Sequence, residues 1–129
     1  MRIYVGYDSR EDLAYEVCKY SILKKNKKVE VIPLKLATMR ELGIYTRPVD
    51  KKASTEFTFS RFFVPYLMDY KGWAMFVDCD FLFLSDPQEV FDLADKNYAV
   101  QVVKHDYTPK STVKMDGQKQ EIYPRKNWS

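Results

Sequence analysis

The order of elements at the start of the chain constrains the fold most. Residues Ile3–Val5 and Val29–Leu34 are β-branched runs that predict two strands. Between them, Glu11–Lys25 has a helical spacing of apolar residues and two lysines in its last turn, where cations suit the helix dipole. Strand, helix and strand at this spacing predict a parallel α/β unit. The residues expected on the buried face of the helix are Ala14, Val17, Cys18 and Ser21.

The later part of the chain predicts further elements of the same kind. In order, these are a short helix at 39–42, a loop at 47–54, a helix at 58–70 containing Pro65, a strand at 73–77, a helix at 85–94 capped by Ser85, a strand at 98–103 and a hairpin at 112–123. We therefore expect one α/β domain over residues 1–129. Its sheet would be Rossmann-like and mostly parallel, with helices on both faces.

Composition excludes several classes of protein. The 129 residues carry a formal net charge of +3, and the basic residues are scattered apart from a short lysine run at 24–28, so nucleic acid is not an expected partner. Two cysteines, Cys18 and Cys79, are too few for a disulfide framework, and no apolar stretch is long enough to span a bilayer. The first residues run directly into a strand rather than a secretory signal, so we expect a cytoplasmic protein.

Two carboxylates follow the apolar strand at 73–77. If the strand continues, Asp78 and Asp80 point to the same side while Cys79 points into the packing. In parallel α/β sheets, ligands bind at the carboxyl ends of strands, and Mg²⁺ and Mn²⁺ favour carboxylate oxygens. The apolar runs on both sides of the pair favour a metal site. The alternative is an ordinary solvated turn.

Four segments in order resemble the nucleotide-sugar glycosyltransferases of the GT-A fold, particularly the family 8-like group, over their N-terminal donor-binding part. They are IYVGYDSRED, STEFTFSRFFVPYL, FVDCDFLFLSDPQEVF and VVKHDYTPK. The resemblance implies a metal-dependent enzyme that moves a hexose from a nucleoside-diphosphate sugar to a sugar or other hydroxyl acceptor.

The resemblance also implies a role for each matching residue. Val5, Tyr7, Asp8 and Arg10 would hold the base and ribose of the nucleoside-diphosphate sugar. Arg61 would lie near the donor sugar or diphosphate, and Asp78 would contact both ribose and metal. Asp80 would bind Mn²⁺ or Mg²⁺, which would screen the leaving diphosphate. Arg61, Asp78 and Asp80 would thus be the catalytic residues.

Other interpretations stay open. Tyr7 and Asp8 could be turn residues, and Arg61 could pair with a surface acid such as Glu56 or Asp69. The chain could be a non-catalytic nucleotide- or metal-binding module, or an incomplete subunit lacking the acceptor half, because members of that family continue past the position of Ser129. Core exposed by such an ending would favour a homo-oligomer. A nucleotidyltransferase is disfavoured because no glycine-rich loop follows the first strand.

Overall fold

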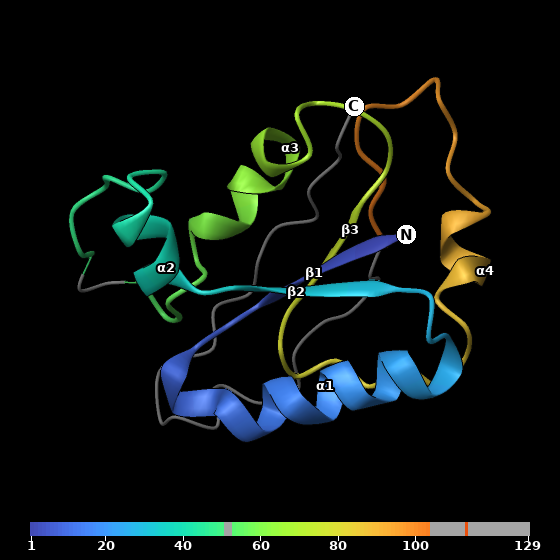
Figure 1. Cartoon of the computed structure of the whole chain (residues 1–129), viewed down its shortest axis with the longest axis horizontal. Helices are drawn as coiled ribbons and strands as arrows, with labels where there is room; N and C mark the ends of the chain where they lie inside the picture. The colour runs from blue at the N-terminus through green and yellow to red at the C-terminus, as the bar shows by residue number, and fades with distance from the viewer. Residues whose placement is uncertain (51–52, 104–112, 114–129) are drawn as a thin grey trace. The chain divides into compact units, whose positions relative to one another are not determined.

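The computed structural model describes residues 1–50, 53–103 and 113. The chain divides into two compact units, Met1–Asp95 and Lys96–Ser129. The elements of the first unit, in chain order (Figure 1), are β1 (Arg2–Gly6), η1 (Ser9–Glu11), α1 (Asp12–Lys25), β2 (Glu30–Leu34), α2 (Leu36–Glu41), η2 (Ser60–Phe63), α3 (Val64–Leu67), β3 (Met75–Val77) and α4 (Gln88–Phe91). The strand–helix–strand start of the sequence is confirmed.

Three parallel strands form the sheet, in the order β2-β1-β3. Tyr4 of β1 is level with Ile32 of β2 and Phe76 of β3. The chain therefore reverses its direction of addition at β1: it first adds β2 on one side, and later adds β3 on the other. The prediction of an α/β fold with parallel strands is confirmed by these three strands.

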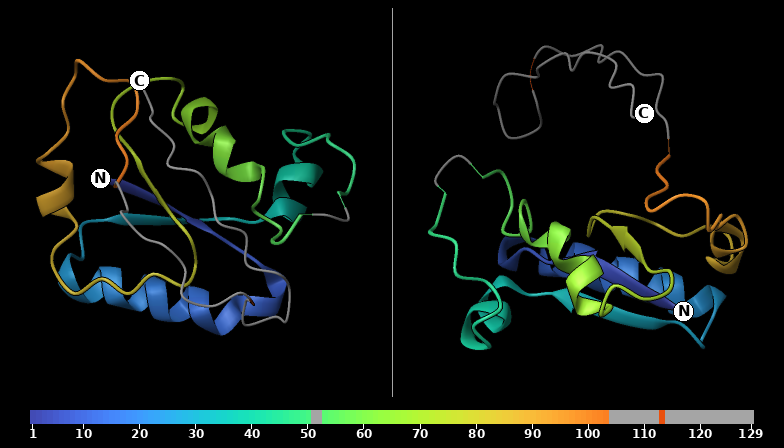
Figure 2. Two further views of the ribbon diagram at one scale, coloured as in Figure 1. Left: turned by 180° about the vertical axis from the view of Figure 1, so that it is seen from behind. Right: turned by 90° about the horizontal axis from the view of Figure 1, so that it is seen from above.

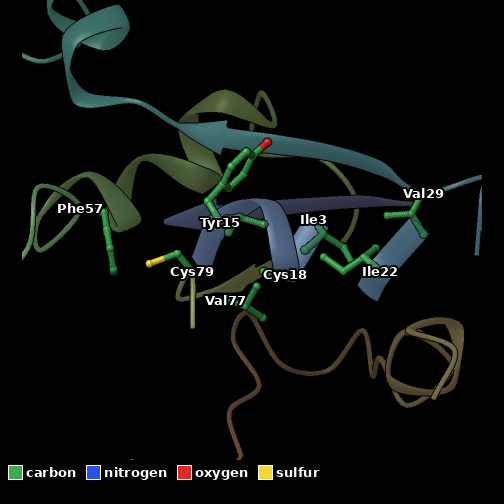
Figure 3. Packing of buried hydrophobic residues seen from close by; sticks show 9 residues of the cluster. Ile3, Tyr15, Cys18, Ile22, Val29, Phe57, Val77 and Cys79 are labelled. Carbon is green, nitrogen blue, oxygen red and sulfur yellow. The ribbon is translucent and has the colours of Figure 1, made fainter. Parts of the chain in front are cut away.

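Alternate residues of β1 face two different layers. Ile3 and Val5 are fully buried in a cluster with Cys18 and Ile22 of α1 (Figure 3). Tyr4, between them in sequence, packs in a second cluster whose partly buried members include residues of η2 and α3 as well as of β2, α2 and β3. Helices thus cover both faces of the sheet, with α1 and α3 on opposite sides of the strands (Figures 1 and 2).

The buried face of α1 differs from the expected one. The helix buries Tyr15, Cys18, Ser21 and Ile22. Cys18 and Ser21 are therefore confirmed, whereas Val17 is 56% exposed and its assignment to the core is wrong. The error arose because α1 carries apolar residues on two opposite faces, so periodicity alone did not identify the face that meets the sheet.

The predicted helix at 58–70 is broken into two short pieces, η2 and α3. Pro65 lies in the first turn of α3, where its missing N–H leaves no hydrogen bond unmade. Val64 donates its backbone N–H to the carbonyl of Arg61, the tighter bond of a 3₁₀ turn, so the α-helix starts anew at this point. The predicted helix at 85–94 is also shorter, and Asp86 rather than Ser85 accepts the N–H of Gln88 at its start.

Residues 98–103 do not form the predicted strand: no strand backbone pairing is found there, and Val100, Val102 and Val103 are exposed. β-propensity alone does not decide a strand, because it depends on the context in which the segment packs. The predicted hairpin lies outside the described residues except for Val113, as does the end of the fourth resembling segment. None of the helices in the described ranges is both long and apolar enough to cross a membrane.

Candidate functional site

The candidate site lies where β1 and β3 end side by side. Because the two strands are parallel and paired, the residues that follow them, Tyr7–Asp8 and Asp78–Asp80, come to the same edge of the sheet. Of the residues predicted for this site, Val5 lies within β1 and its side chain is fully buried in the core. Val5 can therefore reach a ligand only through its backbone.

Asp8 organises the loop after β1. Its side chain is fully buried, and its carboxylate accepts hydrogen bonds from the Arg10 backbone N–H at 3.0 Å, from Arg10 Nε at 2.8 Å and from the Glu56 backbone N–H at 3.1 Å. Arg10 also donates to the carbonyl of Ser54 at 3.0 Å. The hydrogen bonds to Arg10 lower the pKa of Asp8 to about 2. Asp8 and Arg10 thus fix the loop to residues 54–56.

Tyr7 lies beside this loop with its ring partly exposed. Its hydroxyl donates to the Asp12 carboxylate at 2.7 Å, and its ring makes a T-shaped contact with that of Tyr15 at 5.4 Å between centroids. The ammonium of Lys35 lies 4.5 Å from the centre of the Tyr7 ring. Lys35 follows β2, whose carboxyl end lies at the same edge of the sheet. Sequence reasoning missed Lys35, although its place directly after the second predicted strand was a usable signal.

Asp78 and Asp80 lie in a turn and not on the strand. β3 ends at Val77, and Phe81 donates its backbone N–H to the Asp78 carbonyl at 3.4 Å. The side chains of Asp78 and Asp80 were expected to point away from the core and that of Cys79 into it. They do so because of this turn, and not because a strand continues through them. Cys79 is buried in the core cluster beneath the turn, while the side chain of Asp78 is partly exposed and Asp80 is exposed. The buried thiol anchors the turn and leaves both carboxylates at the surface.

Arg61, in η2, contacts Asp78 at this edge of the sheet. Its Nη1 lies 3.5 Å from Oδ1 of Asp78, and its guanidinium lies over the rings of Phe57 and Phe76 at 5.3 and 5.2 Å. The aromatic contacts hold the planar group in one orientation. Arg61 therefore pairs with Asp78, and not with the surface acids Glu56 or Asp69.

The charges of two other acidic residues act on Asp78. Burial raises the pKa of Asp78, Arg61 opposes that rise, and the charges of Asp80 and Glu11 add to it. Glu11 also accepts a hydrogen bond from the Cys79 thiol at 3.2 Å, which ties η1 to the aspartate turn. Sequence reasoning placed Glu11 only at the start of a helix. Its position in the loop after β1 was the signal that it could reach this edge.

The donor set suits a hard divalent cation in part. Among the described residues, no group of three or more His, Cys, Asp or Glu side chains is placed to hold a metal ion. Asp78 and Asp80 offer two carboxylates, and Mg²⁺ is commonly bound by one or two carboxylates together with water and phosphate oxygens. Burial is the main cause of the raised pKa of Asp78, and a cation would relieve the repulsion from Asp80 and Glu11 that adds to it. These residues fit such an ion when water or phosphate supplies the other ligands.

Comparison with known proteins gives one informative match. The chain is 58% identical over 129 residues to Protein CDI of Arabidopsis thaliana. This alignment covers 99% of the chain and 50% of the relative, so the chain spans about half the length of the curated relative it matches. No family model matches the chain. No solved structure matches it either.

These comparisons correct the expected family. The matched relative is named Protein CDI, which is not a glycosyltransferase name, and no family model supports that group. The assignment to family 8-like GT-A glycosyltransferases and the predicted transfer of a hexose are therefore wrong. The resemblance rested on four short segments in order, and unrelated functions share local patterns of this kind on α/β folds.

Proposed function

We propose that the edge formed by β1 and β3 binds a divalent cation, Mn²⁺ or Mg²⁺, together with a phosphate-bearing small molecule. The observation that carries this proposal is the contact of the Arg61 guanidinium with Asp78, at 3.5 Å, just past the end of β3, with Asp80 two residues further on. A lone cluster of acids destabilises itself, whereas acids with a cation and an arginine can together bind a polyanion.

The topology supports this position. In open parallel sheets, ligands bind outside the carboxyl ends of the strands where the order of strand addition reverses. That reversal lies between β1 and β3 in the order β2-β1-β3, and the carboxylates follow β3. We propose in addition that the three strands are part of a larger Rossmann-like sheet.

Each residue has a distinct role in this proposal. Asp78 and Asp80 hold the cation, which screens the negative charge of the phosphate groups. Arg61 lies on the same side as Asp78 and donates to a phosphate oxygen, as its planar fork of N–H groups allows. Tyr7 and Lys35 form a cation–π pair at the neighbouring strand ends, and the rest of the ligand binds beside this pair. Asp8 and Arg10 hold the loop after β1 in one conformation.

Isothermal titration calorimetry with Mn²⁺ and a nucleoside diphosphate tests the proposal. We expect the nucleotide to bind weakly without the metal and at least about tenfold more tightly with it, which corresponds to about 1.4 kcal/mol. Asp80→Asn should abolish this enhancement. Asp69→Asn is the matched control, because Asp69 is a highly exposed carboxylate paired only with Lys71 in the hydrogen bonds and ion pairs described for it.

Arg61→Gln separates the two parts of the site. It should weaken nucleotide binding while Mn²⁺ alone still binds to the carboxylates. The proposal fails if Mn²⁺ leaves nucleotide affinity unchanged, or if Asp80→Asn and Asp69→Asn behave alike. Repeating the titration with inorganic pyrophosphate shows whether the phosphate groups or the base supply the affinity.

A further inference from the structure

Helix α1 carries an apolar stripe on its outer side. Leu13, Val17 and Tyr20 follow one another at spacings of four and three residues, so they lie in one row along the helix. Their exposed fractions are 82%, 56% and 64%. A single exposed apolar residue is ordinary, but three in a row form a surface suited to packing. We call Leu13, Val17 and Tyr20 the α1 stripe.

The core does not need these residues. The opposite face of α1 buries Tyr15, Cys18 and Ile22 against the sheet. A helix that covers a sheet has one apolar face and presents polar residues to water on the other. α1 has two apolar faces, and the second is left without a partner among the described residues of Met1–Asp95, apart from the Lys24 ammonium 5.7 Å from the Tyr20 ring centre.

Charge along α1 changes sign between its two halves. Asp12 and Glu16 lie in the first half, and Lys24 and Lys25 lie in the last turn. This gradient suits the helix dipole, but the dipole does not account for the apolar stripe. When two copies of α1 lie antiparallel, the acidic half of each faces the basic half of the other. The surface around the stripe is therefore complementary to itself.

We propose that the α1 stripe is an interface between two copies of this chain, with the two α1 helices packed antiparallel about a two-fold axis. A two-fold contact uses the same patch on both partners, as a self-complementary surface requires. Leu13, Val17 and Tyr20 supply the apolar seam. With the two-fold axis near Tyr20, Lys24 of one copy lies level with Glu16 of the other, which also pairs with Lys19 of its own chain at 3.6 Å.

The small area that two α1 helices can bury limits the affinity of the dimer. A helix of 14 residues is about 21 Å long at 1.5 Å per residue. One pair of such helices buries less than the roughly 1,200 Å² at which stable interfaces begin. The dimer is therefore weak and forms with a Kd above about 1 μM. Self-association should depend on protein concentration and, because of the charges, on salt.

Sedimentation velocity on the chain from about 10 μM to about 1 mM tests this interface, a range that covers weak association. The sedimentation coefficient should rise with concentration. Val17→Asp should remove that rise by placing a charge within the seam. Val49→Asp is the matched control, because Val49 is 81% exposed and lies outside α1. Far-UV circular dichroism confirms that each variant is folded.

Leu13→Asp provides a second disruption at the first turn, where an added acid suits the helix dipole and folding is preserved. Lys24→Glu should weaken association at least threefold, and adding Glu16→Lys to it should restore most of the loss, because the reversed charges again face each other. A chain that stays monomeric at every concentration overturns the proposal. So does association that both Val17→Asp and Leu13→Asp retain.

Discussion

Gly6 lies directly against the aromatic ring of Phe57. A Cβ added at position 6 would come within 2.5 Å of Cδ2 and 2.7 Å of Cγ of that ring, well inside van der Waals contact. Phe57 is itself buried and packs between the end of β1 and Phe76 of β3. The close approach of these two residues brings the segment at 54–61, and with it Arg61, to the carboxyl edge of the sheet.

Gly6→Ala should therefore destabilise the chain by about 1–3 kcal/mol, because the buried ring of Phe57 has to shift. Urea unfolding followed by circular dichroism measures the change. In a Phe57→Leu background, the added methyl group has more room, so the same substitution should cost less. Equal costs in the two backgrounds would mean that the ring is not what excludes a side chain at position 6.

Asp8 is expected to govern stability in acid. Its pKa is about 2 in the folded chain, against 3.8 when it is unperturbed, because Arg10 and the Glu56 N–H stabilise the carboxylate. A lowered pKa contributes stability above pH 3.8, and that stability is lost as the pH falls from about 3.8 to about 2. Asp8→Asn removes the contribution, at an expected cost of about 2 kcal/mol at pH 7.

Unfolding free energies of both forms between pH 7 and pH 2 check this expectation. The difference between the original chain and Asp8→Asn should be largest near neutral pH and should shrink below pH 4. Asp69→Asn removes an exposed carboxylate and should change stability by less than about 0.5 kcal/mol. A difference for Asp8→Asn that is constant with pH would exclude the ionised Asp8 as its source.

Both cysteines should be unreactive in the folded chain. Burial raises the pKa of Cys18 to about 11 and that of Cys79 to about 12, and the hydrogen bond to Glu11 adds to the second rise. Only the thiolate reacts readily, so a disulfide reagent at pH 8 should modify neither residue in native buffer and both in urea. Lys27→Cys, at an exposed position, is the reactive control. Rapid native modification of Cys79 would show that the aspartate turn opens.

The sequence predicted best those elements whose patterns are local. β1, α1, β2 and β3 appear within a few residues of the predicted bounds, since strand runs and a helical period carry their own signal. Prediction failed where contacts between distant parts of the chain determine the structure. Val17 has the right spacing for the core but lies on the outer face of α1, and 98–103 has strand-like residues but no strand pairing.

The candidate site was partly predictable for the same reason. Asp78 and Asp80 were recognisable because an apolar strand runs into them, and parallel strands end at one edge. Glu11 and Lys35 reach that edge only through the packing of β1 beside β2 and β3, which spacing does not specify. The roles of Asp8 and Arg10 also required the structure, since their mutual hydrogen bonds do not follow from their positions in sequence.

Asp78 is expected to destabilise the folded chain. Its pKa is raised chiefly by burial, so at neutral pH the ionised carboxylate is less stable in the folded chain than in the unfolded one, although Arg61 offsets part of this. The side chain is 40% exposed, so solvent limits the penalty. Asp78→Asn should raise the free energy of unfolding, by less than about 1 kcal/mol, and should abolish the stabilisation that Mn²⁺ with a nucleoside diphosphate provides.

Thermal melts of the two forms with and without Mn²⁺ and the nucleotide measure both effects. Asn keeps the shape of Asp and removes only the charge, so a cavity does not confuse the comparison. A group placed for packing alone gives a lower Tm when it is changed and no interaction with metal. For Asp78→Asn we expect a higher Tm without ligand and no rise in Tm when Mn²⁺ and the nucleotide are added. This combination is expected of a carboxylate that binds a cation at this edge.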